Sequence, residues 1–221
     1  MRSDQFWTYF DTLREPLRLR ANTFATVFER LDQIERPVVI VETGCARKPG
    51  NWSGDGSSTI LFDQYARTHP GSKVHSVDID PRATETCRSL VGECVSIHTG
   101  DSVKFLQSFA DSRSNDSEQL DLVYLDSFDF DRNNPLPSAM HHLLELVAIA
   151  PALHSETMVV VDDAFLTLEA TITGGRLTIL QDPRIDGKAR FVAEYAAKVG
   201  AELLFKDYQC GWIKMRTPTG K

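Results

Sequence analysis

The sequence of 221 residues is short of basic side chains and contains no long hydrophobic run. Lysine and arginine number 24 against 31 aspartates and glutamates, which gives a net charge of −7. This balance excludes the broad basic surface that attracts nucleic-acid phosphates, so we expect no nucleic-acid partner. The longest uncharged apolar stretch, around residues 146–153, is far too short to cross a bilayer. We therefore expect no membrane partner.

Cysteine is also scarce, and its spacing excludes a zinc site. The four cysteines, Cys45, Cys87, Cys94 and Cys210, show neither C-x-x-C spacing nor a zinc pattern. No apolar segment near the N-terminus directs secretion. We expect reduced thiols in a cytoplasmic protein.

Residues 1–36 have the periodicity of helices. Aromatic and aliphatic side chains recur there at three- and four-residue spacing, and Pro16 is expected to divide the segment into two helices. This helical cap can pack on a sheet, or it can act as a lid over a site or as the interface of a homodimer. We expect a boundary at residue 36 and one further domain over residues 37–221.

The most informative stretch follows this cap. Four consecutive aliphatic residues, Val38 to Val41, predict a strand buried on both faces, as in a parallel sheet covered by helices. The strand stops at Glu42, and Gly44 then permits a close backbone approach to a ligand. Because ligands bind at the carboxyl ends of strands in open α/β sheets, we place a site here.

The same unit of apolar strand, acid, turn and helix repeats along the chain. Strands are expected over residues 73–80, 95–99, 120–125 and 157–161. A helix that begins at residues 187–190 is expected within residues 185–199, and a terminal hairpin over 201–215. The acids at or after the strand ends are Asp78, Asp101, Asp126 and the pair Asp162-Asp163.

The segment over residues 47–56 interrupts this pattern. It is longer than a tight strand-to-helix turn, and no Gly-Lys-Ser/Thr follows, so it is neither a Walker loop nor a clean dinucleotide fingerprint. We expect it to form a rim of the site, with Trp52 as an exposed apolar contact.

Together these motifs resemble the motif series of the class I S-adenosylmethionine-dependent methyltransferases, over roughly Val38 to Met215. The resemblance implies a three-layer αβα sandwich, with a doubly wound, seven-stranded, mostly parallel sheet whose last strand is antiparallel. It also implies S-adenosylmethionine (SAM) as cofactor. Glu42, Thr43 and Gly44 would lie near its methionine part, Asp78 with Ile79 at the ribose, and Asp101 with Ser102 by the adenine; Asp126 completes the set.

Within this superfamily, Asp126 together with Asp162-Asp163 resembles the metal-dependent O-methyltransferases. The resemblance implies a Mg²⁺ ion on Asp126, Asp162 and Asp163, since such an ion prefers oxygen ligands and can activate an acceptor hydroxyl. Asp126, Asp129 and His142 are the candidate catalytic residues, with His141 as an alternative to His142. Asp163 could instead cap a helix, and Asp129 could be a solvated charge. Lys188 is a surface charge or a cation near an acidic substrate group.

The expected activity is methyl transfer from SAM to a small-molecule acceptor, through a hydroxyl oxygen activated by Mg²⁺. One alternative is a metal-independent N- or C-methyltransferase of the same fold. Another is a nicotinamide-dependent oxidoreductase, in which Asp78 again holds a ribose. A third is a binding subunit that keeps the fold without the chemistry.

Overall fold

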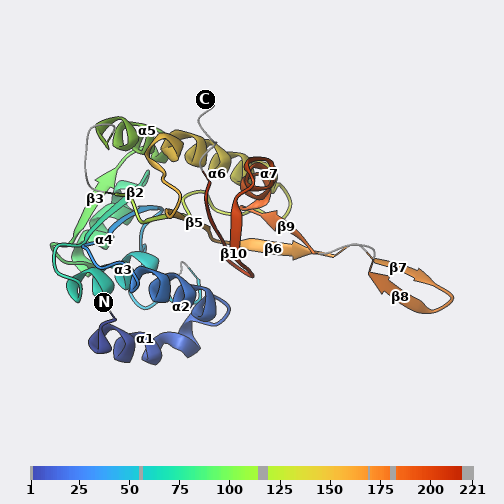
Figure 1. Ribbon diagram of the computed structural model, residues 1–221, viewed down its shortest axis with the longest axis horizontal. Coiled ribbons are helices and arrows are strands. Elements are labelled where there is room, and N and C mark those ends of the chain that lie inside the picture. The colour runs from blue at the N-terminus through green and yellow to red at the C-terminus, as the bar shows by residue number, and fades with distance from the viewer. Residues whose placement is uncertain (1, 55–56, 114–118, 169, 180–182, 216–221) are drawn as a thin grey trace.

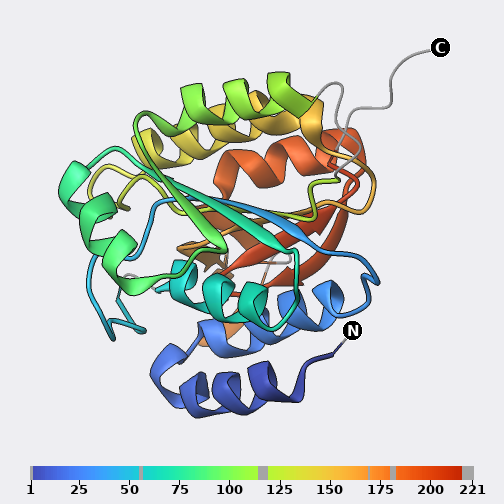
Figure 2. The ribbon, with the colours of Figure 1, turned by 90° about the vertical axis from the view of Figure 1, so that its left-hand side faces the viewer.

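The computed structural model describes residues 2–54, 57–113, 119–168, 170–179 and 183–215. A central sheet lies between two layers of helices (Figures 1 and 2). Its strands are β1 (Val39–Thr43), β2 (Lys73–Asp78), β3 (Val95–Thr99), β4 (Leu122–Leu125), β5 (Met158–Val161), β10 (Glu202–Lys206) and β11 (Cys210–Ile213). The helices are α1 (Asp4–Leu17), α2 (Arg20–Leu31), α3 (Ser58–Arg67), α4 (Pro81–Leu90), α5 (Ser102–Arg113), α6 (Leu136–Ile149), the 3-10 turn Ala150–Ala152 and α7 (Arg190–Val199).

The sheet has seven strands in the order β10-β11-β5-β4-β1-β2-β3. Strands β1 to β5 pair in parallel, whereas β11 runs antiparallel to both β5 and β10. All five residues of β1 are buried, as its unbroken apolar run predicts for a strand covered on both faces. The expected fold class, a doubly wound αβα sandwich with an antiparallel last strand, is confirmed.

Alternate residues of the central strands enter two separate cores. Ile40 and Tyr124 pack with aromatic side chains of α1, α2 and α3 on one face of the sheet. Val41 and Leu125 pack with α5, α6 and α7 on the other face. Figure 2 shows these two helical layers on opposite sides of the sheet. The carboxyl edge of the sheet, between the layers, is left for a site.

The N-terminal helices belong to the first of these cores. The ring of Phe24 on α2 stacks on that of Tyr124 on β4, with centroids 5.6 Å apart. Pro16 lies in the last turn of α1 rather than between the helices, and the break falls at Arg18, whose φ is 51°. The expected boundary at residue 36 stays a prediction, although the hydrophobic core crosses it.

An arm leaves the sheet after β5 and projects away from the body (Figure 1). Strand β6 (Ala164–Thr167) pairs with β9 (Arg184–Gly187) at its base, and β7 (Ala170–Thr173) pairs with β8 (Arg176–Ile179) at its tip. The helix expected within residues 185–199 is present, and residues 184–187 before it are held extended by pairing with β6. Helix α7 begins only at Arg190.

No helix in the described part of the chain is long and apolar enough to span a membrane.

Candidate active site

Two adjoining cavities lie at the carboxyl edge of the sheet. The first cavity, of about 230 Å³, is lined by Gly44, Asp78, Ile79, Asp126, Ser127 and Asp129, among others. The second cavity, of about 310 Å³, is lined by Asp78, Ile79, Asp101, Ser102, Ser127, Phe128 and His141. Because Asp78, Ile79 and Ser127 border both, the two cavities form one elongated site that runs from β1 to β3.

Gly44 sets the floor of the first cavity. Its backbone φ is +80°, a conformation that favours glycine, and a Cβ added there would lie 2.6 Å from the carbonyl oxygen of Asp126. Its amide also donates to the carbonyl of Val77, at 2.8 Å. The turn after β1 is thus drawn against both neighbouring strands, and this close approach requires glycine.

Asp78 stands at the junction of the two cavities. Its Oδ1 accepts a hydrogen bond from the amide of Asp80 (2.8 Å), and its Oδ2 accepts one from the amide of Cys45 (3.2 Å). The carboxylate is thus fixed in orientation, and each oxygen keeps a second lone pair for a hydroxyl donor. Ile79 beside it is 72% exposed, so an uncovered apolar surface adjoins the acid.

A buried carboxyl group organises the second cavity. Glu145 on α6 accepts hydrogen bonds from Ser127 Oγ (2.6 Å) and Thr43 Oγ1 (3.1 Å), and its Oε1 lies 3.3 Å from His141 Nε2. Burial acts to raise the pKa of Glu145, but its hydrogen bonds, first that with His141, outweigh burial and lower it. The hydrogen bond to Glu145 in turn raises the pKa of His141.

Asp101 and Ser102 begin α5 beside this network. Asp101 Oδ1 accepts from the amide of Lys104 at 2.9 Å, so it caps the helix and lines the second cavity at once. Ser102 Oγ lies 3.0 Å from His141 Nε2. Capping the helix therefore leaves Asp101 at the wall of the second cavity.

Glu42 and Thr43 lie beneath the site and line neither cavity. Glu42 is fully buried and accepts hydrogen bonds from Ser58, Thr59 and Ser76. Burial raises the pKa of Glu42 to about 8, against the opposing effect of these hydroxyl donors. Both residues support the glycine turn from below, and their expected contact with the methionine part of the cofactor stays a prediction.

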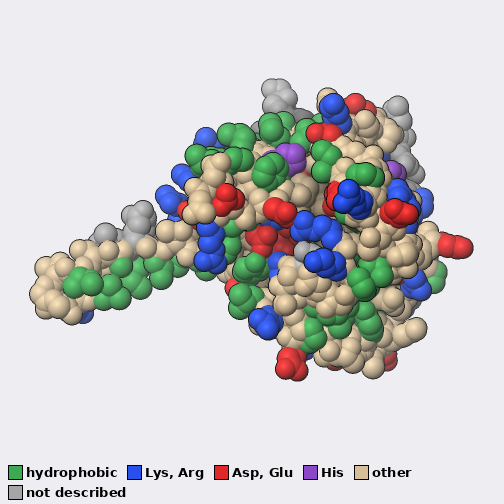
Figure 3. All heavy atoms as spheres, turned by 180° about the vertical axis from the view of Figure 1, so that it is seen from behind, with side chains coloured by type: hydrophobic (Ala, Val, Ile, Leu, Met, Phe, Trp, Pro, Cys, Tyr) green, Lys and Arg blue, Asp and Glu red, His purple; other side chains and the backbone are tan. Residues whose placement is uncertain are grey.

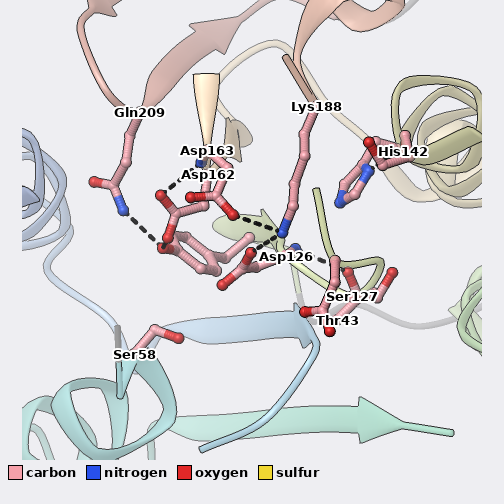
Figure 4. Close-up of polar contacts among 12 residues, drawn as sticks. Thr43, Ser58, Asp126, Ser127, His142, Asp162, Asp163, Lys188 and Gln209 are labelled. Atoms are coloured by element: carbon pink, nitrogen blue, oxygen red, sulfur yellow. Dashed lines mark hydrogen bonds and ion pairs between the residues drawn. The ribbon is translucent and has the colours of Figure 1, made fainter. Parts of the chain in front are cut away.

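A buried lysine occupies the centre of the predicted metal site. Lys188, which follows β9, extends its ammonium group between two aspartates (Figure 4). Its Nζ lies 2.5 Å from Asp126 Oδ1 and 3.0 Å from Asp163 Oδ2, and the residue is 1% exposed. Burial acts to lower the pKa of Lys188, but the two aspartates outweigh it and raise the pKa. Burial raises the pKa of Asp126 well above its ordinary range, and Lys188 opposes this.

Arg20 of α2 neutralises the third aspartate. Its Nε donates to both oxygens of Asp162, at 3.0 and 2.8 Å, and Asp162 Oδ2 also accepts from the Tyr124 hydroxyl at 2.7 Å. The Asp163 amide donates to Asp162 Oδ1 at 2.7 Å. The carboxylate of Asp162 is thus fully engaged by the protein itself.

The predicted Mg²⁺ site does not fit this arrangement. Asp126, Asp162 and Asp163 meet at the expected strand ends, but Lys188 and Arg20 bind the oxygens that would hold the ion. Among the described residues, no group of three histidine, cysteine, aspartate or glutamate side chains could hold a metal. The strand-end pattern alone did not reveal the two cations, which come from distant segments.

Two expected catalytic residues have other surroundings. Asp129 lies at the rim of the first cavity and forms an ion pair with Arg47, at 3.0 Å. His142 is fully buried, lines neither cavity, and its Nδ1 lies 2.6 Å from the carbonyl of Ser138. Burial lowers the pKa of His142 to about 4. Of the two adjacent histidines it is His141 that faces the site.

The loop over residues 47–56 forms part of the rim only at Arg47. Trp52 is half-buried and packs against the first core, so the expectation of an exposed contact is wrong. The carbonyl of Ser53 accepts from Arg20 Nη1 at 3.3 Å, which ties the loop to α2. Residues 55–56 lie outside the described part of the chain.

A third cavity lies at the base of the arm, and Gly187, the residue before Lys188, is part of its lining. It measures about 350 Å³ and is lined by Phe130, Arg132, Pro135, Phe165, Thr167, Asp186 and Gly187. The rings of Phe130 and Phe165 lie 4.8 Å apart between centroids. Figure 3 shows acidic and basic side chains gathered around a hollow on this face, next to the arm. The cavity thus combines an aromatic wall with the polar side chains of Arg132, Thr167 and Asp186.

No protein-family model and no curated protein sequence matches the chain. Among solved structures it is similar to DhpI in complex with S-adenosylhomocysteine (SAH), with a TM-score of 0.44, 12% identity and coverage of 94% of this chain and 93% of that one. LepI in complex with SAM has a TM-score of 0.46 and 13% identity, with coverage of 85% of this chain and 46% of that one. The rRNA methyltransferase aviRa from Streptomyces viridochromogenes has a TM-score of 0.36 and 12% identity, with coverage of 76% of this chain and 86% of that one. These likenesses are too distant to transfer an activity, so function is inferred from the site.

Proposed function

We propose that this protein transfers a methyl group from SAM to a small-molecule acceptor. The observation that carries the proposal is the elongated site formed by the first and second cavities, with Asp78 at their junction. A nucleoside with an amino-acid tail suits this shape. Its ribose hydroxyls need a hydrogen-bond acceptor in the middle of the site, and its base and its tail need room on either side. The close turn at Gly44 leaves backbone, not a side chain, on the floor of the first cavity.

Four groups of this chain would hold the cofactor. Asp78 accepts the ribose hydroxyls, as an acid at the end of the second strand does in nucleotide-binding sheets. Ile79 and Phe128, which are 72% and 44% exposed, cover the faces of the adenine in the second cavity. Ser102 and His141 lie at its edge, and the methionine part enters the first cavity beside Gly44. Bound there, SAM supplies an electrophilic methyl group on a positively charged sulfur.

The acceptor is proposed to enter through the third cavity. Phe130 and Phe165 would contact an apolar or aromatic body, while its hydroxyl would point to Asp126. A carboxylate whose pKa is raised by burial is a better proton acceptor, so Asp126 is the proposed general base. Lys188 holds Asp126 in place and stabilises its ionised form between proton transfers.

This activation needs no metal ion. The three aspartates and the two cations Lys188 and Arg20 leave one negative charge uncompensated among them. Such a charge favours a sulfonium nearby. Lys188 holds Asp126 close to Asp163, and Arg20 holds Asp163 close to Asp162, so the two cations bridge the three carboxylates without an ion.

Cofactor binding is tested by thermal unfolding with SAH and, in parallel, with NAD. A ligand at 100 times its Kd stabilises the native state by about 2.7 kcal/mol, so SAH should raise the melting temperature by several degrees. Asp78→Asn should weaken SAH about tenfold or more, because it removes one charged acceptor of the ribose hydroxyls. Asp111→Asn, an exposed acid on α5, is the matched control and should leave binding unchanged. A shift with NAD and none with SAH would refute the proposal in favour of an oxidoreductase.

Metal independence is tested without knowing the acceptor. Calorimetric titration of Mg²⁺ into the protein, alone and saturated with SAH, should show no binding heat, and EDTA should not change the SAH affinity. A stoichiometric Mg²⁺ site that disappears in Asp162→Asn would instead restore the metal-dependent interpretation.

A further inference from the structure

The tip of the arm is an amphipathic ribbon. In its antiparallel register, Ala170 lies opposite Ile179 and Ile172 lies opposite Leu177. Directly opposed residues point to the same side of a two-stranded ribbon, and the residues between them point to the other side. One face of the tip is therefore wholly aliphatic. The other face carries Thr171, Thr173, Arg176 and Thr178.

This aliphatic face is uncovered in the single chain. Ile172 is 74% exposed, Leu177 is 64% exposed and Ile179 is 57% exposed, and Leu168 at the approach to the tip is 55% exposed. The turn that joins the strands is well formed, because Gly174 and Gly175 both have positive φ, as tight hairpin turns require. An isolated two-stranded hairpin is only marginally stable in water. The ordered ribbon thus presents a surface that gains stability when it is covered.

A matching surface exists on α6. Leu136, Met140, Leu144 and Val147 recur on one side of this helix and are between 47% and 55% exposed. The only charged residue of α6, Glu145, is buried in the site, so no charge interrupts this stripe. The stripe is about 16 Å long at the helical rise, and a four-residue strand of the tip spans about 13 Å. The two surfaces agree in length and in chemistry.

We propose that the arm of one molecule packs its aliphatic face on α6 of a second copy, and that the second copy returns the same contact. Each chain carries both halves of the contact, which is the condition for a closed twofold dimer. Two such contacts would bury on the order of 1,600 Å², the size of an ordinary specific interface. The N-terminal helices, by contrast, direct their aromatic residues into their own core.

The proposed dimer has a bearing on the active site. The arm departs directly after Asp163 and returns directly before Lys188, whose amide donates to the Asp163 carbonyl at 3.2 Å. Helix α6 carries His141 and Glu145 of the second cavity. Each contact would therefore link the arm of one molecule, which leaves the body between Asp163 and Lys188, to the helix that carries His141 and Glu145 in the other molecule.

The first experiment measures mass in solution. Sedimentation velocity at micromolar concentration should give a dimer for the native chain. Ile172→Asp with Leu177→Asp should give a monomer, and so should Met140→Asp with Leu144→Asp. The matched control is Thr171→Asp with Thr178→Asp, which places the same charges on the polar face of the ribbon and should remain a dimer. Melting curves show whether each variant is still folded.

A second experiment locates the contact independently of stability. Ile172→Cys combined with Met140→Cys should give a covalent dimer with a short bismaleimide, whereas each single variant should not. A monomeric native protein, a dimer that survives both aspartate pairs, or a dimer broken equally by the threonine control would overturn the proposal. So would a monomer whose arm binds lipid vesicles, since the occupant would then be a membrane surface.

Discussion

At the scale of single residues, Gly44 decides how closely β1 approaches β4. Replacing it by alanine brings a Cβ to 2.6 Å from the Asp126 carbonyl and adds the strain of a φ of +80°. We expect Gly44→Ala to lower the free energy of unfolding by about 1–3 kcal/mol and to weaken SAH at least tenfold.

Gly200 provides the control for this change. It also has a positive φ, +71°, but no atom lies within 4 Å of the point that an added Cβ would occupy. Gly200→Ala should cost stability by strain alone and leave the SAH affinity, measured by calorimetry, unchanged. Equal losses of affinity in both variants would show that the close approach at Gly44 has no special part in the site.

His142 gives a prediction about pH. Its folded pKa of about 4 lies below the ordinary value of about 6.5, because burial disfavours the charged ring. Between pH 6.5 and 4 the unfolded chain then binds more protons, so the free energy of unfolding falls as the pH falls, by up to about 1.4 kcal/mol per pH unit. Below pH 4 this contribution levels off. Urea unfolding at several pH values should show a shallower slope in His142→Gln; an unchanged slope would contradict the assignment.

The sequence identified the acids of the site but not their partners. Asp78 and Asp101 could be predicted because each follows a strand of the parallel sheet, and parallel strand ends share one edge. Lys188 and Arg20 follow no such rule, since they reach the cluster from the return of the arm and from α2. A buried cation beside three aspartates changes the chemistry from metal binding to an internal ion-pair network, and only tertiary structure brings it there.

At the scale of elements, β9 matters because it delivers Lys188. Lys188→Met fills a similar volume but leaves the buried Asp126 without its cation, and Asp163 with Arg20 alone. Breaking a buried pair in this way costs about 3–5 kcal/mol, so we expect a loss of that order in the free energy of unfolding. The exposed Lys198→Met on α7 should change it by less than about 0.5 kcal/mol. A stable Lys188→Met protein would mean that Asp126 is already protonated in the native state.

The strands of the main sheet were predictable and those of the arm were not. Strands β1, β4 and β5 are mostly apolar and buried on both faces, which leaves a strong signal in the sequence. Strands β7 and β8 are four residues long and exposed throughout, so no buried apolar run marks them in the sequence. The extended state of residues 184–187 depends on pairing with β6, which lies 17 to 23 residues earlier in the chain, so no local pattern predicts it.

At the scale of the whole molecule, the N-terminal helices and the sheet share one core. Removing residues 1–36 would take Phe24 and Phe28 out of that core and leave Asp162 without Arg20. We expect the shortened chain to lose cooperative thermal unfolding, followed by circular dichroism. Removal of residues 1–2 alone should leave the melting curve unchanged. A shortened chain that still unfolds cooperatively and binds SAH would establish a true domain boundary at residue 36.

The arm is joined to the body through the paired strands β6 and β9, with Ala164 opposite Gly187. The two ends of the arm are thus paired with each other before the tip begins. Changes in length or sequence beyond this closure leave the positions of Asp163 and Lys188 untouched. The tip can therefore differ between related proteins, and with it the surface available for association, while the side chains at the base of the arm keep their positions.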